Sequence, residues 1–130
     1  MAEAKAFLKS YGQTPRKTRV VANLVKGKKV EDAINILDFT IKRPAQPIKK
    51  LINSAVVNAK NQGLSPKELF IKSITVNNGG MYKRIRPASR GSAHQIRHHL
   101  SHVSVVLTTD VPKKKGRISK SRNQQPATKN

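Results

Sequence analysis

Two kinds of residue are scarce in this sequence: it has no cysteine, and only six of its 130 residues are Asp or Glu. Without cysteine the chain has no disulfide framework and no thiolate metal site. Six acids leave little from which to build a carboxylate pair or a nucleophile–base–acid set, so we expect neither an enzyme nor a cofactor. We find no apolar run of membrane-spanning length and no signal-peptide apolar region, and therefore expect a cytoplasmic protein with no membrane partner.

Lysine and arginine, in contrast, are abundant: 27 of them give a net charge of +21. A charge of this size and sign is typical of a protein that binds a polyanion, usually nucleic acid. The excess is uneven, since no acid lies between Glu68 and Asp110, and residues 70–109 hold six basic residues, four of them Arg. Arginine can donate two hydrogen bonds to one phosphate and can stack on a base, so this bias favours contact with RNA over a merely solvated surface.

The first half of the chain has the apolar spacing of three helices. In the first, Thr14 and Pro15 take the N-cap and first helical positions, and the helix is expected to end near Lys26. The second is predicted from about Val30 to Phe39, and the third, ending before Gly63, has the clearest pattern. The apolar stripe of the first helix is expected to comprise Val20, Val21, Leu24 and Val25, and that of the third Ile48, Leu51, Ile52, Ala55, Val56 and Ala59.

The second half has two strand-like runs, residues 70–76 and 103–107, on either side of a basic stretch. In the second run Val103, Val105 and Leu107 alternate, and we expect them to face the core. With a weak strand at residues 4–8 the two runs predict a small antiparallel sheet covered by three helices, an α+β fold. We expect one globular domain over residues 1–110, from which a long β-hairpin, about 77–102, protrudes. Residues 111–130 are basic and lack hydrophobic periodicity, so they are expected to form a disordered, flexible tail.

The place where the hairpin turns is left open by local sequence. Asn78-Gly79 is the stronger two-residue turn signal, and a turn there would pair residues 81–87 back onto 70–76. The alternative turns near Ser89 to Ala93, with residues 77–80 forming a bulge or kink in one long strand. The two possibilities are nearly equal on the residues alone.

Basic residues and histidines are the candidate RNA-binding groups. Three histidines, His94, His98 and His102, recur every four residues, but on a strand they span too far for one ion and have no nearby acid or thiolate. Base stacking or phosphate binding therefore fits them better than a metal. The candidates are Arg16, Lys17, Arg19, Lys26, Lys28, Lys83, Arg84, Arg86, Arg90, Arg97, His98, His99 and His102.

A different class of function is also considered. The first two helices, joined through Gly27, could form the helix-turn-helix of a DNA-binding regulator. The second helix, however, carries Glu31, Asp32 and Asp38 where a recognition helix should be basic.

Four stretches in order carry a resemblance to a known family. They are P-R-K-T-R-V-V-A-N-L-V-K-G-K-K-V at 15–30, K-K-L-I-N-S-A-V-V-N-A at 49–59, K-R-I-R-P-A-S-R-G-S-A at 83–93 and L-S-H-V-S-V-V-L at 100–107. Together they resemble the bacterial large-subunit ribosomal protein twenty-two family. The chain departs from the usual family pattern at Ala88 and Ser92, where the family usually shows basic residues, and at His98 and His99, where it usually shows Lys-Arg.

The resemblance implies a structural constituent of the large ribosomal subunit that binds large-subunit rRNA, supports subunit assembly and is not a homo-oligomer. It places the turn near Ser89 to Ala93 and implies that the hairpin lines the polypeptide exit tunnel. The implied partners are rRNA, neighbouring large-subunit ribosomal proteins and the nascent polypeptide. The implied tunnel-lining residues are Arg86, Pro87, Ala88, Ser89, Arg90, Gly91, Ser92, Ala93 and His94.

Overall fold

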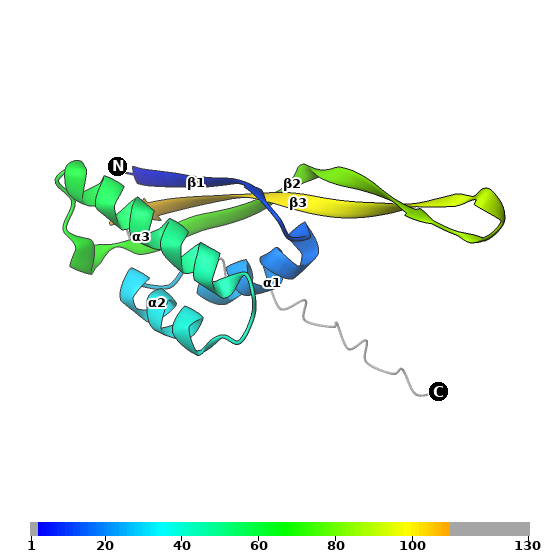
Figure 1. Cartoon of the computed structure of the whole chain (residues 1–130). Coiled ribbons are helices and arrows are strands. Elements are labelled where there is room, and N and C mark those ends of the chain that lie inside the picture. Colours follow the sequence, from blue (N-terminus) through cyan, green and yellow to red (C-terminus); the bar gives the residue numbers. More distant parts are fainter. Residues whose placement is uncertain (1–2, 110–130) are drawn as a thin grey trace, which may run out of the picture.

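The computed structural model of the chain describes residues 3–109, which form three helices packed on a three-stranded antiparallel sheet (Figure 1). This α+β fold confirms the class expected from the sequence; the tail expected at 111–130 lies outside the described residues. The elements in chain order are β1 (Glu3–Tyr11), α1 (Pro15–Val25), α2 (Val30–Phe39), α3 (Ala45–Asn61), β2 (Phe70–Pro87) and β3 (Ala93–Thr108), with short 3-10 turns at Pro66–Glu68 and Ser89–Gly91.

The sheet has the order β1-β3-β2, so the last strand lies between the other two. Alternation along β3 turns Val103, Val105 and Leu107 toward the helices, and all three are buried. Val105 is paired with Ala6 on one side and with Ile74 on the other, so small and branched side chains form the sheet's half of the core. The inward face expected for the returning strand is therefore confirmed.

The helices supply the other half of the core, mainly through α3. Its expected stripe is confirmed: Ile48, Ile52, Ala55 and Ala59 are fully buried, while Val56 packs at the edge of the core. α1 differs from expectation, because Val20 and Leu24 are 56% and 45% exposed.

The buried face of α1 is instead made by Thr18, Val21, Ala22 and Val25. Small Thr18 and Ala22 allow the helix to approach the sheet closely, and the Thr18 hydroxyl is satisfied because it donates to the Thr14 carbonyl at 3.1 Å. The prediction that Val20 and Leu24 belong to the core was therefore wrong. It assumed that a buried helix face contains only apolar residues.

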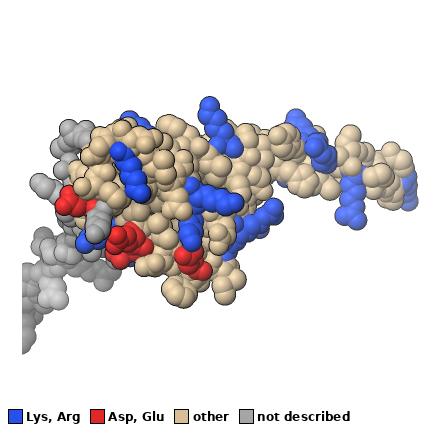
Figure 2. Space-filling model, turned by 60° about the vertical axis from the view of Figure 1, so that its left-hand side comes forward, with Lys and Arg blue, Asp and Glu red and all other residues tan. Residues whose placement is uncertain are grey.

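The hairpin turns at Ser89–Gly91, the second of the two possibilities. There Arg90 adopts a φ of 56°, and the Ala88 amide donates to the Ser92 carbonyl at 2.9 Å. Gly79 and Gly80 instead lie where the pairing register of β2 shifts, between Asn78 and Met81. One long hairpin results. Its outer part, residues 81–99, extends well past the helices and is called the arm; the remaining described residues are called the body (Figures 1 and 2).

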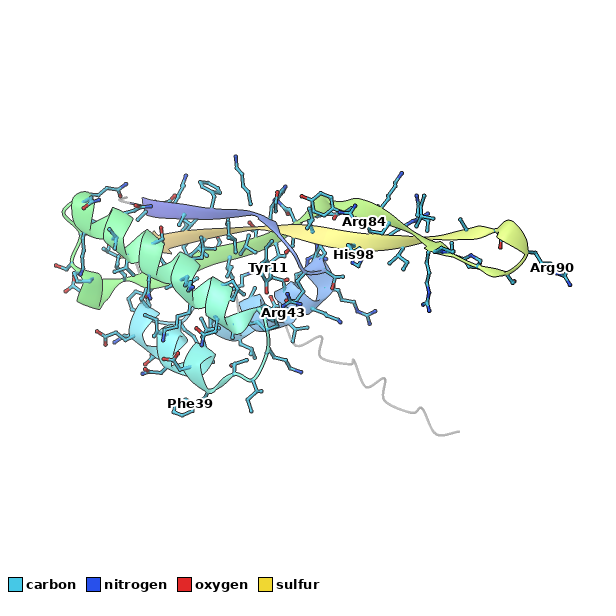
Figure 3. The ribbon with its side chains drawn as sticks, viewed as in Figure 1. Tyr11, Phe39, Arg43, Arg84, Arg90 and His98 are labelled. Atoms are coloured by element: carbon cyan, nitrogen blue, oxygen red, sulfur yellow. The ribbon has the colours of Figure 1, made fainter. Side chains whose placement is uncertain are left out.

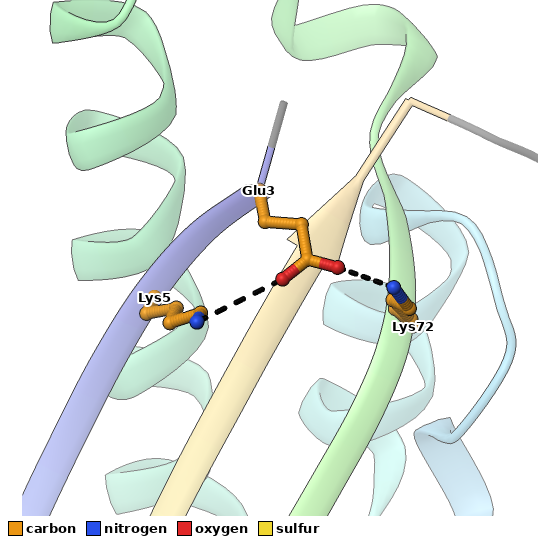
Figure 4. A network of polar contacts seen from close by, with 3 residues as sticks. All are labelled: Glu3, Lys5 and Lys72. Carbon is orange, nitrogen blue, oxygen red and sulfur yellow. Dashed lines mark hydrogen bonds and ion pairs between the residues drawn. The ribbon is translucent and has the colours of Figure 1, made fainter. Parts of the chain in front are cut away.

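Across the body, one carboxylate links the two outer strands over the central one (Figure 4). Glu3 on β1 accepts a hydrogen bond from Lys72 on β2 and lies 3.8 Å from the Lys5 ammonium. The Lys72 hydrogen bond, and then its positive charge, hold the pKa of Glu3 below its ordinary value. A carboxylate whose folded pKa is lowered stabilises the fold above its unfolded pKa, about 4.3, and loses that contribution as the pH falls through the folded pKa.

We therefore expect Glu3→Gln to lower the free energy of unfolding slightly at pH 7. The difference from wild type should shrink as the pH falls below about 4, because wild type then loses the same charge. Urea denaturation of both proteins at pH 7 and at about pH 3 measures this. A difference that keeps its full size at the lower pH would show that the pair of lysines is not its cause.

Candidate nucleic-acid interface

The arm has almost no interior. Every residue from 81 to 98 is exposed except Ala88, which is partly covered. Its larger apolar side chains do not make a core, since Tyr82, Ile85 and Ile96 are 54%, 75% and 40% exposed. Two strands without a packed face are marginal in water. Residues 3–109 therefore give the arm no packed face of its own.

Positive charges face each other across the arm. Lys83 is paired directly with Arg97. Like charges placed opposite each other destabilise a strand pair. The ion pairs found among residues 3–109 use only Lys5, Lys49 and Lys72, all in the body. The described part of the chain thus leaves the charge of the arm uncompensated.

Both faces of the arm carry cations. Alternation places Arg84 and Arg86 on the face that also holds Tyr82 and His98, and puts Lys83 and Arg97 on the other. The Arg84 guanidinium lies 5.6 Å from the centre of the Tyr82 ring, which holds a planar cation over an aromatic surface. In the view of Figure 2, Lys and Arg extend along the arm, whereas Asp and Glu appear only on the body. A partner that matched this distribution would surround the arm rather than touch one side.

Four of the predicted residues come together where the arm meets the body. Lys17 of α1 and Arg97, His98 and His99 of β3 line one cleft of about 340 Å³. Arg43, in the loop between α2 and α3, completes it, and sequence reasoning had missed this residue. In Figure 3 Arg43 lies beside Tyr11, whose hydroxyl donates to the Arg43 carbonyl at 3.4 Å. The signal that could have found Arg43 is the pair of adjacent basic residues, Lys42 and Arg43, before Pro44; both are exposed.

Tyr82 also lines this cleft and was likewise missed. An aromatic residue directly before Lys83-Arg84 is the interleaving of rings and cations that single-stranded RNA favours. Burial raises the pKa of the other tyrosine, Tyr11, whose hydroxyl donates at 2.9 Å to Gln13, itself in the lining of the cleft. Tyr11 therefore supports the cleft from behind.

Other predicted residues lie apart from this cleft. Arg19 donates from Nε to the Val76 carbonyl at 3.1 Å, and so covers the outer edge of β2. His102 accepts the Ser10 amide at Nδ1, 2.9 Å away, which ties β1 to β3. Arg16 is exposed near the start of α1, while Lys26 and Lys28 are exposed beyond its end, in a loop that hydrogen-bonds to β2 through Gly27 and Ile71.

At the far end, the residues of the turn are exposed apart from Ala88, and Arg90 points outward from the tip (Figure 3). Nothing among residues 3–109 groups three or more His, Cys, Asp or Glu side chains closely enough to hold a metal ion. Within the same range, no helix is both long and apolar enough to cross a membrane.

The body is a packed α+β domain, and the arm is a cationic hairpin without a core. This combination is typical of proteins that bind a folded nucleic acid through a basic extension. Comparison with known proteins makes the class specific: the family described as ribosomal protein L22p/L17e matches residues 6–108. The chain belongs to this family, and is a structural constituent of the large ribosomal subunit, located in the ribosome.

Relatives agree over nearly their whole length. The large ribosomal subunit protein uL22 of Syntrophotalea carbinolica is 45% identical over 106 residues, 81% of this chain and 96% of the relative. That of Desulfitobacterium hafniense is 44% identical over 117 residues, 89% of this chain and 100% of the relative. That of Streptococcus pyogenes is 43% identical over 109 residues, 83% of this chain and 96% of the relative. The family assignment leaves the helix-turn-helix interpretation without support.

Proposed function

We propose that this protein binds large-subunit rRNA through its arm and the adjoining side of α1, and that the tip of the hairpin lines the polypeptide exit tunnel. The observation that carries the proposal is the arm itself: exposed on both faces, free of acids, and with Lys83 paired directly against Arg97. Such a hairpin is stabilised when phosphates lie between and around its charges. Arginine, the commoner cation there, suits bidentate contact with phosphate.

The shape of the tip favours a place beside a passage. Between Arg86 and His94 the residues are Pro, Ala, Ser, Arg, Gly, Ser and Ala, so six of seven are small or turn-forming. The turn is narrow and is held by hydrogen bonds of its own backbone and of the Ser92 hydroxyl, which donates to the Ser89 carbonyl at 2.8 Å. Arg86 and Arg90 are positioned to hold RNA, while the small residues face a nascent polypeptide.

The same geometry bears on assembly. An arm that has no core and is surrounded by RNA cannot easily enter RNA that is already fully folded. We infer that the arm binds while the surrounding rRNA still folds, and that it supports subunit assembly by compensating phosphate charge there. Its partners are then rRNA, neighbouring large-subunit proteins and the nascent polypeptide, with one copy of the chain per site.

Deleting residues 88–92 tests the role of the tip. The free energy of unfolding of the isolated protein should change by less than about 0.5 kcal/mol, because these residues lie far from the core. Subunits should still assemble, whereas stalling on arrest peptides should change because the tunnel wall has changed. Ser54→Ala, an exposed change on α3, serves as the control and should leave stalling as in wild type. Unfolding of the isolated deletion variant would contradict the proposal, and so would unchanged stalling in assembled ribosomes.

A further inference from the structure

The cleft between the arm and the body has features that a general RNA-binding surface does not require. We call it the root cleft. It has a volume of about 340 Å³ and is lined from three places: the start of α1, the loop after α2 and the inner end of the arm. Its lining residues are Gly12, Gln13, Thr14, Lys17, Arg43, Tyr82, Arg97, His98, His99 and Leu100.

The charge of the root cleft is uncompensated. Lys17, Arg43 and Arg97 contribute three cationic side chains, and the lining contains no acid. None of the three forms an ion pair in the described part of the chain, where the ion pairs involve other lysines. Cations from separate elements would repel one another around an empty concavity. An anion bound among them removes that cost.

The root cleft also spans the place where the three-stranded sheet of the body becomes the two-stranded arm. We call this place the joint. The register of β2 shifts between Asn78 and Met81, where Gly80 has a φ of +89°. The pairing of β1 shifts between Leu8 and Tyr11, next to Ser10 with a φ of 53°, and β1 ends there. Beyond this point only two strands continue. Past this point β1 and the helices no longer pack against the hairpin, and this is where the root cleft begins.

We propose that the root cleft binds the phosphodiester backbone of one unpaired RNA strand, and that this strand fixes the direction of the arm relative to the body. Lys17 and Arg43 bind phosphates of the strand from the body, and Arg97 binds a phosphate from the arm. A bound strand therefore connects the two sides of the joint. The proposal rests on the rRNA binding proposed above and adds a particular subsite, a particular form of RNA and a mechanical role.

The size and lining of the root cleft select an unpaired strand. Its volume lies at the small end of the range for small-molecule sites, enough for one group of about nucleotide size to enter. Tyr82 and His98 add two rings to the lining, on the face of the arm opposite Arg97, and unpaired bases stack on such rings whereas paired bases are not free to do so.

The test uses the full chain, a single-stranded oligouridine, and an RNA hairpin whose paired stem and loop carry the same number of phosphates. Arg43→Gln removes one cation of the root cleft without touching the arm. Lys50→Gln is the matched control, because it also removes one exposed cation, from α3 and outside the root cleft. Binding is measured over a range of salt concentrations, and hydrogen exchange of the arm amides is followed with and without RNA.

For Arg43→Gln we expect single-strand binding to weaken roughly fivefold and the slope of log K against log salt to fall by about 0.7, the value for one lost phosphate contact. The uridine strand should protect arm amides near His98 in wild type and in Lys50→Gln, and much less in Arg43→Gln. Equal binding by the two variants would overturn the root-cleft proposal while leaving rRNA binding by the arm intact. Tighter binding of the RNA hairpin than of the single strand would also overturn it. Absence of RNA binding by wild type would instead remove the proposed function on which it rests.

Discussion

Neutralising the cations of the two arm strands is expected to weaken binding to large-subunit rRNA by roughly two orders of magnitude at physiological salt. The variant replaces Lys83, Arg84, Arg86 and Arg97 with Gln. Each phosphate contact contributes about 0.7 to 0.9 to the salt slope, so losing four should lower the slope by about 3. Because none of the four is ion-paired within residues 3–109, their loss should leave the body folded.

Filter binding at several salt concentrations measures both quantities. A variant with Lys50→Gln and Lys60→Gln on α3 controls for the general loss of positive charge, and should change the slope much less. Circular dichroism should show the same thermal unfolding in all three proteins. If the arm variant kept the wild-type slope, the arm would not be the main contact with phosphate.

The second large effect concerns the body. Ile52→Ala should lower the free energy of unfolding by about 3 kcal/mol, within the 2–5 kcal/mol typical of such truncations, because Ile52 is 0% exposed at the centre of the core. Val57 lies on the same helix but is 54% exposed, so Val57→Ala should cost less than about 1 kcal/mol. Urea denaturation compares the two. Similar losses for both would mean that α3 does not face the sheet as described.

Regular periodicity made much of this fold predictable. The stripe of α3 and the alternation of Val103, Val105 and Leu107 each indicate one buried face, and both faces are buried as expected. α1 was less predictable because its buried face includes Thr18, whose hydroxyl is satisfied by its own helix. The sequence does not distinguish a buried threonine of this kind from an exposed one. Only the packing of the helix on the sheet does.

The turn shows why local signals can be insufficient. Asn78-Gly79 suits a tight turn, yet Gly79 lies within the long strand, where a side chain would meet the His102 ring at 3.0 Å. The glycine is needed for this close approach, and His102 is in turn bonded to Ser10 of β1. These partners are distant in sequence. Their effect on residues 78–80 therefore cannot be derived from those residues alone.

For the candidate interface, charge density selected residues of the arm but only some of those that line the root cleft. Lys17 and Arg97 were selected from the density of positive charge, whereas Arg43 was considered only as part of the segment that ends the second helix. The structure brings Arg43 to the arm through the loop between α2 and α3. Arg19 and His102, chosen for their charge, also hydrogen-bond within the sheet. Charge density thus indicates that RNA is bound, and only the fold shows which cations converge.

The absence of cysteine allows a direct test of where the hairpin tip lies. Ser89→Cys at the tip and Ser54→Cys on α3 each introduce a single exposed thiol, to which a short photo-crosslinker can be attached. The labelled proteins are incorporated into ribosomes that hold a stalled nascent chain. We predict that illumination links the nascent chain to position 89 and not to position 54. A nascent chain linked to position 54, or to neither position in ribosomes that contain the labelled protein, would contradict the placement of the hairpin tip at the tunnel wall.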